Sequence, residues 1–167
     1  LASGCLSIAG GDAAPKEYNV ILISIDTLRA DHLGAYGYGR PTSPNLDAFA
    51  GMSTLFANAY SPAPSTLPAH ASLFTGAYPS VHDADLAGRS SLGSDFSALA
   101  EILSGKGYRT ASFNGGGQLA AYSGMGQGFD IYNDSHPSFR DNFDLSIEWL
   151  EGNKDERFFL FIHGYDV

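Results

Sequence analysis

The sequence contains a single cysteine, so no disulfide can form within the chain. Basic residues are scarce as well, because 9 Lys and Arg stand against 18 Asp and Glu, for a net charge of −9. Proteins that bind nucleic acid need a basic surface, so no nucleic-acid partner is expected. No apolar run reaches the roughly 18 residues of a membrane-spanning helix. The 20 glycines and 44% hydrophobic residues are typical of one globular domain with a sizeable core.

Residues 1–18 are expected to precede the folded domain. Small residues come before the cysteine in Leu1-Ala2-Ser3-Gly4-Cys5, and glycine, alanine and proline follow it. This segment resembles the end of a bacterial lipoprotein signal peptide, in which the cysteine carries lipid and the next residues form a tether. An ordinary signal-peptide remnant and a frayed terminus with a free thiol are the alternatives. The lipoprotein interpretation implies membrane attachment through Cys5, and either signal-peptide interpretation places the protein outside the cytoplasm, in a bacterial periplasm or on its membrane.

From residue 19 onward, expected strands alternate with expected helices. The β-branched run at 19–25 predicts a strand buried on both faces at the centre of a parallel sheet. Further strands are expected at 55–60, 108–113 and 158–162. Helices are expected at 44–50 after Ser43, at 67–74, from Ser94 or Asp95 to 104, and around Phe143, Ile147 and Leu150. This alternation predicts an α/β domain with a mostly parallel sheet and helices on both faces.

In such a sheet, ligands bind at the carboxyl ends of the strands. The expected strands place Asp26 and Thr27, the loop that ends at Thr66, residues 114–117 and residues 163–166 at this edge. We therefore expect four strand ends to converge on one crevice.

Three residues near this edge carry the types of group that catalysis requires. Asp26 follows a buried apolar run, where a carboxylate needs a metal ion or several donors, or else it caps the next turn. Thr66 begins a helix, so its hydroxyl can attack phosphorus or sulfur beside a metal, or simply serve as an N-cap, and Ser65 competes for either role. His70, one turn later, can contact a bound oxyanion or guide a proton, or be an ordinary surface histidine.

Longer motifs make the chain resemble the sulfatase family of the alkaline-phosphatase superfamily. They are NVILISIDTLRADHLGAYGY at 19–38, TSPNLD at 42–47 and STLPAHASLFTG at 65–76. Shorter matches follow at 78–79, His82, 107–111, 126–130 and 158–163, so the resemblance covers nearly everything after residue 18. The implied domain organisation is a tether at 1–18 and, at 19–167, the amino-terminal part of a sulfatase-like catalytic domain.

The resemblance assigns roles to individual residues. Asp26 matches the first metal-binding aspartate, whereas Thr27 replaces the second aspartate of the usual pair. Thr66 stands at the nucleophile of the Cys/Ser-x-Pro-Ser-Arg signature, Pro68 matches its proline, and His70 replaces its arginine. The implied cofactor is a divalent metal ion held by Asp26 and Thr66, with calcium expected and manganese or zinc as alternatives.

Two departures from the family pattern bear on the reaction. Sulfatases oxidise their cysteine or serine nucleophile to formylglycine, and threonine cannot give that aldehyde. Residues 114–117 read Asn-Gly-Gly-Gly where many sulfatases carry Gly-Lys-Trp-His, so the lysine and histidine that hold sulfate are replaced. A threonine nucleophile resembles phosphoglycerol and phosphoethanolamine transferases instead. The substrate contacts that remain as candidates are Thr27, Asn114 and His163.

Three functions are compatible with these motifs. The first is a metal-dependent hydrolase that cleaves a sulfate or phosphate ester of a small molecule or glycan through attack by Thr66. The second is a phosphotransferase that passes a phosphoryl group from Thr66 to an alcohol. The third is a non-catalytic member that binds anionic glycans. The resemblance also implies that the later half of the metal site lies beyond Val167, so we expect the isolated chain to be inactive.

Overall fold

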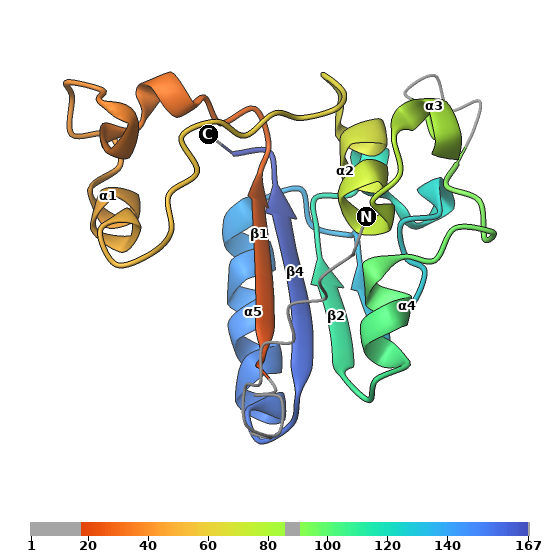
Figure 1. Cartoon of the computed structure of the whole chain (residues 1–167). Coiled ribbons are helices and arrows are strands. Elements are labelled where there is room, and N and C mark those ends of the chain that lie inside the picture. Colours follow the sequence, from red (N-terminus) through yellow and green to blue (C-terminus); the bar gives the residue numbers. More distant parts are fainter. Residues whose placement is uncertain (1–17, 86–90, 167) are drawn as a thin grey trace, which may run out of the picture.

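The computed structural model describes residues 18–85 and 91–166. Within them, the strands β1 (Val20–Ile25), β2 (Arg109–Phe113), β3 (Ile131–Asn133) and β4 (Phe158–Gly164) form one parallel sheet in the order β1-β4-β2-β3 (Figure 1). The predicted α/β class with a parallel sheet is therefore confirmed. Residues 1–17 lie outside the described residues, and so does the predicted lipid attachment at Cys5. The boundary of the tether stays a prediction.

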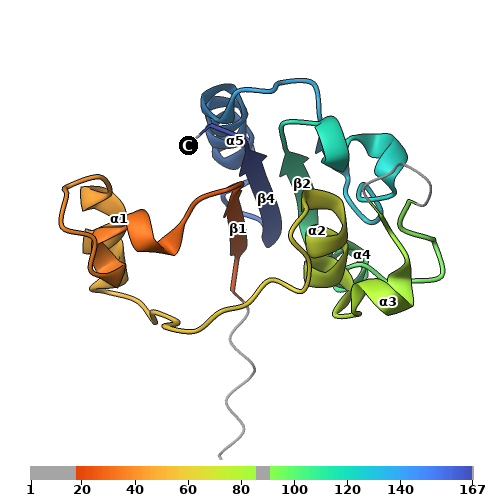
Figure 2. The ribbon, with the colours of Figure 1, turned by 90° about the horizontal axis from the view of Figure 1, so that it is seen from above.

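Helices cover both faces of the sheet, as predicted. Helices α2 (Thr66–Thr75) and α4 (Leu99–Ser104) lie on one face, and α5 (Phe139–Asn153) lies on the other (Figure 2). Helix α1 (Pro44–Ala50) lies to the side of the sheet, beyond β1, and α3 (Pro79–His82) follows α2. None of the helices in the described part of the chain has the length and apolar character needed to cross a bilayer.

Strand β4 is the centre of the molecule, because all seven of its residues are buried. Its side chains alternate between two hydrophobic cores, as expected for a strand covered on both faces. Phe159 and Phe161 pack in the core beneath α2 and α4, whereas Leu160 and Ile162 pack in the core beneath α5. This arrangement fixes the end of β4, where His163 lies, against its neighbours on both sides.

Among the described strands, β1 lies at an edge of the sheet rather than at its predicted centre. It pairs with β4 alone among the described strands, and Ile21 and Ile23 are 50% and 49% exposed. The physical reason is the position of α5, which packs on β4 and β2 and leaves that face of β1 uncovered. A continuous apolar run therefore did not identify a fully buried strand here.

Other expectations also need correction. Residues 55–60 form no strand, and Tyr60 is 87% exposed. Helix α4 begins at Leu99 rather than at Ser94 or Asp95, because the Glu101 carboxylate reaches back to accept the Ala98 N–H at 2.8 Å and fixes the helix start there. The short strand β3 was not predicted. The helices expected at 44–50 and 67–74, and the strands expected at 108–113 and 158–162, match α1, α2, β2 and β4 within two residues.

Candidate active site at the carboxyl edge of the sheet

The carboxyl edge of the sheet brings together Asp26 and Thr66, two residues 40 positions apart in the sequence. Asp26 directly follows β1, and its own N–H still donates to the Gly164 carbonyl of β4 at 3.0 Å. Thr66 is the first residue of α2, and its Oγ1 donates to Asp26 Oδ2 at 2.8 Å. Thr66 is buried and Asp26 is largely buried, so a carboxylate and a hydroxyl meet with little competition from water.

His163 completes this group from β4. Its Nε2 lies 3.4 Å from Asp26 Oδ2, and its ring is fully buried. Among the described residues, Nδ1 of this ring has no hydrogen-bond partner. Burial, and then the neighbouring His70, lower the pKa of His163 to about 4, while Asp26 partly opposes the shift. His163 is therefore a neutral imidazole at neutral pH, which is the form that can accept a proton or bind a metal ion.

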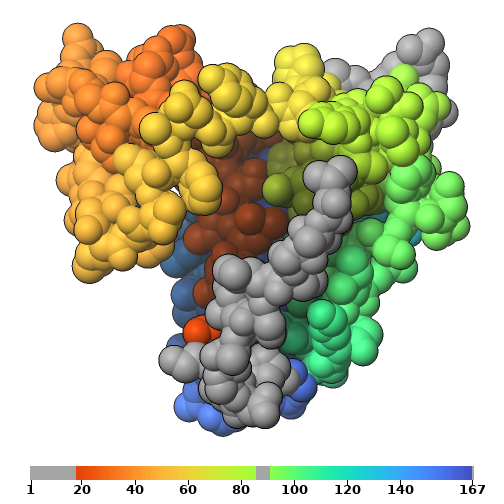
Figure 3. Space-filling model, viewed as in Figure 1, coloured from red at the N-terminus to blue at the C-terminus, as the bar shows by residue number. Residues whose placement is uncertain are grey.

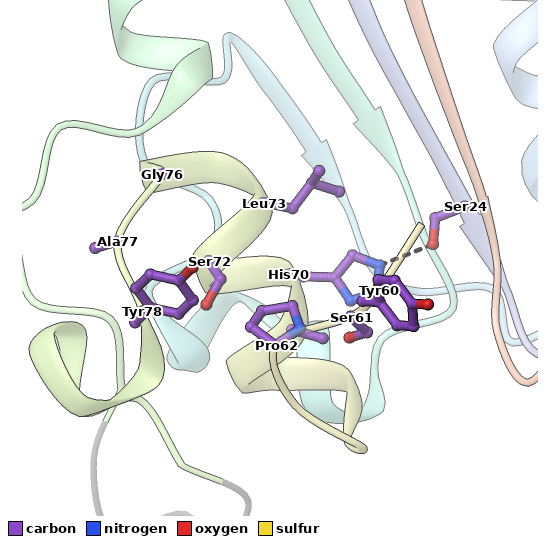
Figure 4. Close-up of a pocket in the computed structure, with 11 residues that line it drawn as sticks. Ser24, Tyr60, Ser61, Pro62, His70, Ser72, Leu73, Gly76, Ala77 and Tyr78 are labelled. Atoms are coloured by element: carbon purple, nitrogen blue, oxygen red, sulfur yellow. Dashed lines mark hydrogen bonds between the residues drawn. The ribbon is translucent and has the colours of Figure 1, made fainter. Parts of the chain in front are cut away.

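His70 lies one turn into α2 and uses both ring nitrogens within the protein. Nδ1 is 2.7 Å from the Thr66 carbonyl, which can only accept, so Nδ1 carries the hydrogen. Nε2 then accepts from the Ser24 hydroxyl at 2.9 Å (Figure 4). Burial lowers the pKa of His70, which favours this neutral form. The structure thus places His70 behind Thr66 as a link between α2 and β1, and its predicted contact with the transferred group stays a prediction.

The start of α2 bears on the capping alternative for Thr66, whereas its predicted role as nucleophile stays a prediction. Ser65 occupies the N-cap position in an extended backbone conformation, and its side chain makes no capping hydrogen bond. Thr66 is therefore the first helical residue rather than the N-cap, and its hydroxyl is directed to Asp26 instead of to the helix backbone. The next backbone N–H, that of Leu67, donates to Gln118 Oε1 at 3.1 Å.

A glycine-rich loop after β2 lies beside this helix start. Asn114 is fully buried, and it shapes the loop by accepting the Gly116 N–H at 2.9 Å and donating to Ser112 Oγ at 3.1 Å. Tyr165 closes over the loop, because its hydroxyl donates to the Gly116 carbonyl at 3.1 Å and its ring packs edge-on against His163. With both polar groups of its side chain bonded to the chain, Asn114 shows no free group for a substrate, and that predicted role stays a prediction.

Thr27 lies on a different side of Asp26. It is exposed and lines a cavity of about 540 Å³ that also includes Arg29, His32 and Asp166. Arg29 is paired with Asp31 at 2.6 Å. This cavity adjoins the end of β1 that precedes Asp26, and the predicted substrate contact of Thr27 stays a prediction.

A second cavity, of about 440 Å³, lies along the outer side of α2. Ser24 and His70 form part of its lining, together with Tyr60 and Tyr78 (Figure 4). Neither Asp26 nor Thr66 lines it, so His70 lies between this cavity and the Thr66–Asp26 hydrogen bond. The space-filling view shows the surface hollowed above β1, between the lobe that contains α1 and the region of α2 and α3 (Figure 3).

The side chains at this site are of the types that bind a divalent cation, but they are few. Carboxylate and hydroxyl oxygens and a neutral imidazole are ordinary ligands of calcium, manganese or zinc. Within residues 18–85 and 91–166, however, no three His, Cys, Asp or Glu side chains lie close enough together to hold a metal ion. Asp26, Thr66 and His163 thus have the side-chain types of metal ligands, but the described residues form no complete metal site.

Sequence reasoning missed three residues of this site, namely Ser24, Gln118 and Tyr165. Tyr165 falls within the strand-end segment 163–166, so the segment was predicted but its packing on the glycines was not. Gln118 directly follows the glycine run, and nothing in its type or spacing indicates that it bonds to α2. Ser24 is hidden within the apolar run of β1, and its role depends on which residue of α2 faces it.

Comparison with known proteins agrees with this site and fold. A family model described as Sulfatase matches residues 18–165, and the chain therefore belongs to the sulfatase family. Arylsulfatase A from Bos taurus is 37% identical over 112 residues, which cover 63% of this chain and 22% of that protein. The chain thus spans about a fifth of the length of this curated relative.

Solved structures of other proteins show the same fold. The structure of BT4656 in complex with its substrate D-glucosamine-2-N,6-O-disulfate matches with a TM-score of 0.77 at 22% identity, over 89% of this chain and 34% of that chain. The phosphonate monoester hydrolase of Agrobacterium radiobacter matches with a TM-score of 0.73 at 22% identity, over 88% of this chain and 40% of that chain.

Proposed function

We propose that this sulfatase-family protein is a metal-dependent hydrolase that cleaves a sulfate or phosphate ester with Thr66 as the nucleophile. The observation that carries the proposal is the 2.8 Å hydrogen bond from Thr66 Oγ1 to Asp26 Oδ2 at the carboxyl edge of the sheet. A nucleophilic hydroxyl needs a neighbouring group that orients it and takes its proton, and the buried Asp26 carboxylate is placed to do both. The substrate would be a small-molecule or glycan ester, and we place the protein outside the cytoplasm, as its first residues suggest.

The reaction follows from the contacts of Thr66. Its Oγ1 forms a bond to the phosphorus or sulfur of the ester, and its proton passes along the hydrogen bond to Asp26 Oδ2. The bond between that centre and the ester oxygen breaks, and the departing alkoxide takes a proton from solvent water and leaves as the alcohol. The hydroxide so formed attacks the same centre and releases phosphate or sulfate, while Asp26 returns its proton to the Thr66 oxygen. His70 holds the Thr66 carbonyl throughout and keeps the first turn of α2 in place.

Asp26 and Thr66 would hold a divalent cation, with His163 beside them as an imidazole donor. Calcium is the expected ion from the family resemblance, with manganese or zinc as alternatives. When bound, such an ion supplies positive charge that lowers the pKa of a hydroxyl and stabilises the charge that develops in the transition state.

Asp26→Asn should then lower the metal content of the purified protein severalfold, because an amide binds a dication more weakly than a carboxylate. Unchanged metal content in elemental analysis would mean that Asp26 does not bind the metal ion and only caps the following turn.

The identity of the nucleophile favours phosphorus over sulfur as the reacting centre. Threonine carries a methyl group on Cβ, so its oxidation cannot give an aldehyde. The family resemblance implies that sulfatases need this aldehyde for their reaction. For the same reason, a phosphotransferase that passes the phosphoryl group to an alcohol is the second candidate. Both activities use the same residues up to the phosphothreonine, so only the acceptor differs.

Trapping the covalent intermediate tests the nucleophile directly. Full-length protein quenched during turnover of a phosphate ester should carry one phosphoryl group on the peptide that contains Thr66. Thr66→Ala should lose the adduct and reduce kcat by at least about 10³-fold, as removal of a nucleophile does. Thr54→Ala, an exposed threonine outside the site, serves as the matched control and should leave both unchanged. Turnover that survives in Thr66→Ala would eliminate Thr66 as the nucleophile.

A further inference from the structure

The peptide group that follows Thr66 is held at both of its polar atoms by side chains from outside the first turn of α2. Its carbonyl oxygen, on Thr66, accepts from His70 Nδ1 at 2.7 Å. Its N–H, on Leu67, donates to Gln118 Oε1 at 3.1 Å. Because one planar unit is fixed at two opposite atoms, its rotation about the helix start is restrained. The Thr66 side chain lies directly on this restrained unit.

Gln118 provides an acceptor that the helix itself does not offer. The first N–H groups of a helix have no intrahelical partner, and they are normally satisfied by a capping side chain or water. Here the N-cap Ser65 makes no side-chain cap, and Pro68 has no N–H to offer. Leu67 is 5% exposed, so without Gln118 its N–H would lose this hydrogen bond in a buried position.

The loop that carries Gln118 has little freedom to move it. Gly116 and Gly117 have φ values of 64° and 60°, which disfavour any side chain. A Cβ on Gly116 would lie 2.6 Å from the Asp134 carbonyl oxygen, and one on Gly117 would lie 3.1 Å from the Tyr165 hydroxyl. On the other side of Gln118, Leu119 is fully buried in the core beneath α2. The glutamine is therefore fixed from both directions along the chain.

We propose that Gln118 is a positioning residue for the reaction, and that it holds the Thr66–Leu67 peptide in the orientation that directs Thr66 Oγ1 to Asp26. The proposal rests on the proposed nucleophilic role of Thr66. It also implies that the Leu67 N–H is already used, so the anionic ester does not bind at this donor. Gln118 therefore acts on the rate of attack rather than on the affinity for the ester.

Two substitutions at Gln118 separate positioning from a general effect on folding. In the full-length protein, Gln118→Ala removes the acceptor and should lower kcat about 10- to 100-fold, the range that a small misplacement of a reacting group costs, with KM changed less than about threefold. Gln118→Glu keeps an acceptor for Leu67 N–H, so kcat should return to within about threefold of wild type. Its added negative charge should raise KM for an anionic ester, and salt should weaken that increase.

Gln127→Ala is the matched control. Gln127 also fixes a loop through its side-chain amide, which donates to the Gly124 carbonyl at 2.8 Å, and the side-chain hydrogen bonds that it makes to the described residues go to the carbonyls of Leu92, Gly93 and Gly124 rather than to α2. This variant should keep wild-type kcat and KM. Equal losses of kcat in Gln118→Ala and Gln127→Ala would overturn the proposal. An unchanged kcat with a lower KM in Gln118→Ala would also overturn it, since the glutamine would then compete with the ester for Leu67 N–H.

Hydrogen exchange of the Leu67 amide provides a readout that does not need turnover. Exchange should be at least tenfold faster in Gln118→Ala than in wild type or in Gln127→Ala, and Gln118→Glu should restore protection. Equal exchange in wild type and Gln118→Ala would contradict the restraint on the peptide even if activity changed. Full activity in Thr66→Ala, by contrast, would refute the nucleophile and leave the exchange result intact, so the two failures are distinguishable.

Discussion

Thr27 shows how closely the backbone is constrained beside the reactive carboxylate. Asp26 still belongs to the sheet through its N–H, whereas Thr27 already turns away with a φ of 59°. A β-branched residue in this left-handed region is unusual, because its side chain crowds its own backbone. The turn that directs Asp26 toward Thr66 is thus made at the cost of local strain at the next residue.

Thr27→Asn should relieve this strain, since asparagine tolerates the left-handed region much better than threonine. We expect the free energy of unfolding in urea to rise by about 1 kcal/mol. Thr54→Asn, an exposed threonine that has no positive φ, should change it by less than about 0.5 kcal/mol. Equal stability of wild type and Thr27→Asn would show that the turn is not strained.

Residue types and positions predicted part of the site but not its internal contacts. Asp26 and Thr66 could be chosen because one follows a strand and the other begins a helix, and parallel strands place such residues at one edge. The hydrogen-bond partners of His70 could not be predicted in this way. Its bond to Ser24 depends on how α2 lies on β1, and no property of either residue encodes that placement.

Helix α2 depends on one face for its attachment to the sheet. Phe74 is 3% exposed and packs against Phe161 with ring centroids 5.0 Å apart, whereas the adjacent Leu73 is 53% exposed. Because Thr66 lies at the other end of the same ten-residue helix, this contact also supports the site.

Phe74→Ala should lower the free energy of unfolding by about 3 to 5 kcal/mol, the usual range when a buried phenylalanine is removed. Leu73→Ala on the same helix should cost less than about 1 kcal/mol, because half of that side chain is already in water. Chemical denaturation of the two variants measures the difference. Similar losses would mean that the outer face of α2 is covered in solution.

The helices and strands were predicted best where the hydrophobic pattern and the length of a segment indicate the same type of element. They were predicted least well where the burial of a face depends on the neighbouring elements. The apolar run of β4 predicted a strand, and α5 and α2 cover its two faces. The similar run of β1 predicted a strand buried on both faces, yet α5 does not extend over Ile21 and Ile23. In α5 itself, the helix was predicted, but Phe143 and Ile147 face outward, while Asn142 and Ser146 are buried. Sequence periodicity identifies an element, whereas the face that is covered depends on the other elements.

At the scale of the whole molecule, the site creates a dependence of folding on pH. His70 and His163 meet edge to face with centroids 5.0 Å apart, and both are buried as neutral rings. Burial lowers the pKa of each, to about 4 for His163, against about 6.5 for a histidine in the unfolded chain. Between these values the unfolded chain binds more protons than the folded chain, so stability falls as the pH falls.

We therefore expect the free energy of unfolding, measured in the presence of a chelator, to be highest above pH 6.5 and to decrease down to about pH 4. The contribution of His163 alone is about 3 kcal/mol over this range, and His70 adds to it in the same direction. His163→Asn removes one of the titrating rings and should flatten the decrease, even though it lowers stability at pH 7. His32→Asn, an exposed histidine, should keep the wild-type slope. A His163→Asn variant with the wild-type slope would mean that the pKa of this ring is the same in the folded and the unfolded protein, so that His163 would not be the group that causes the decrease.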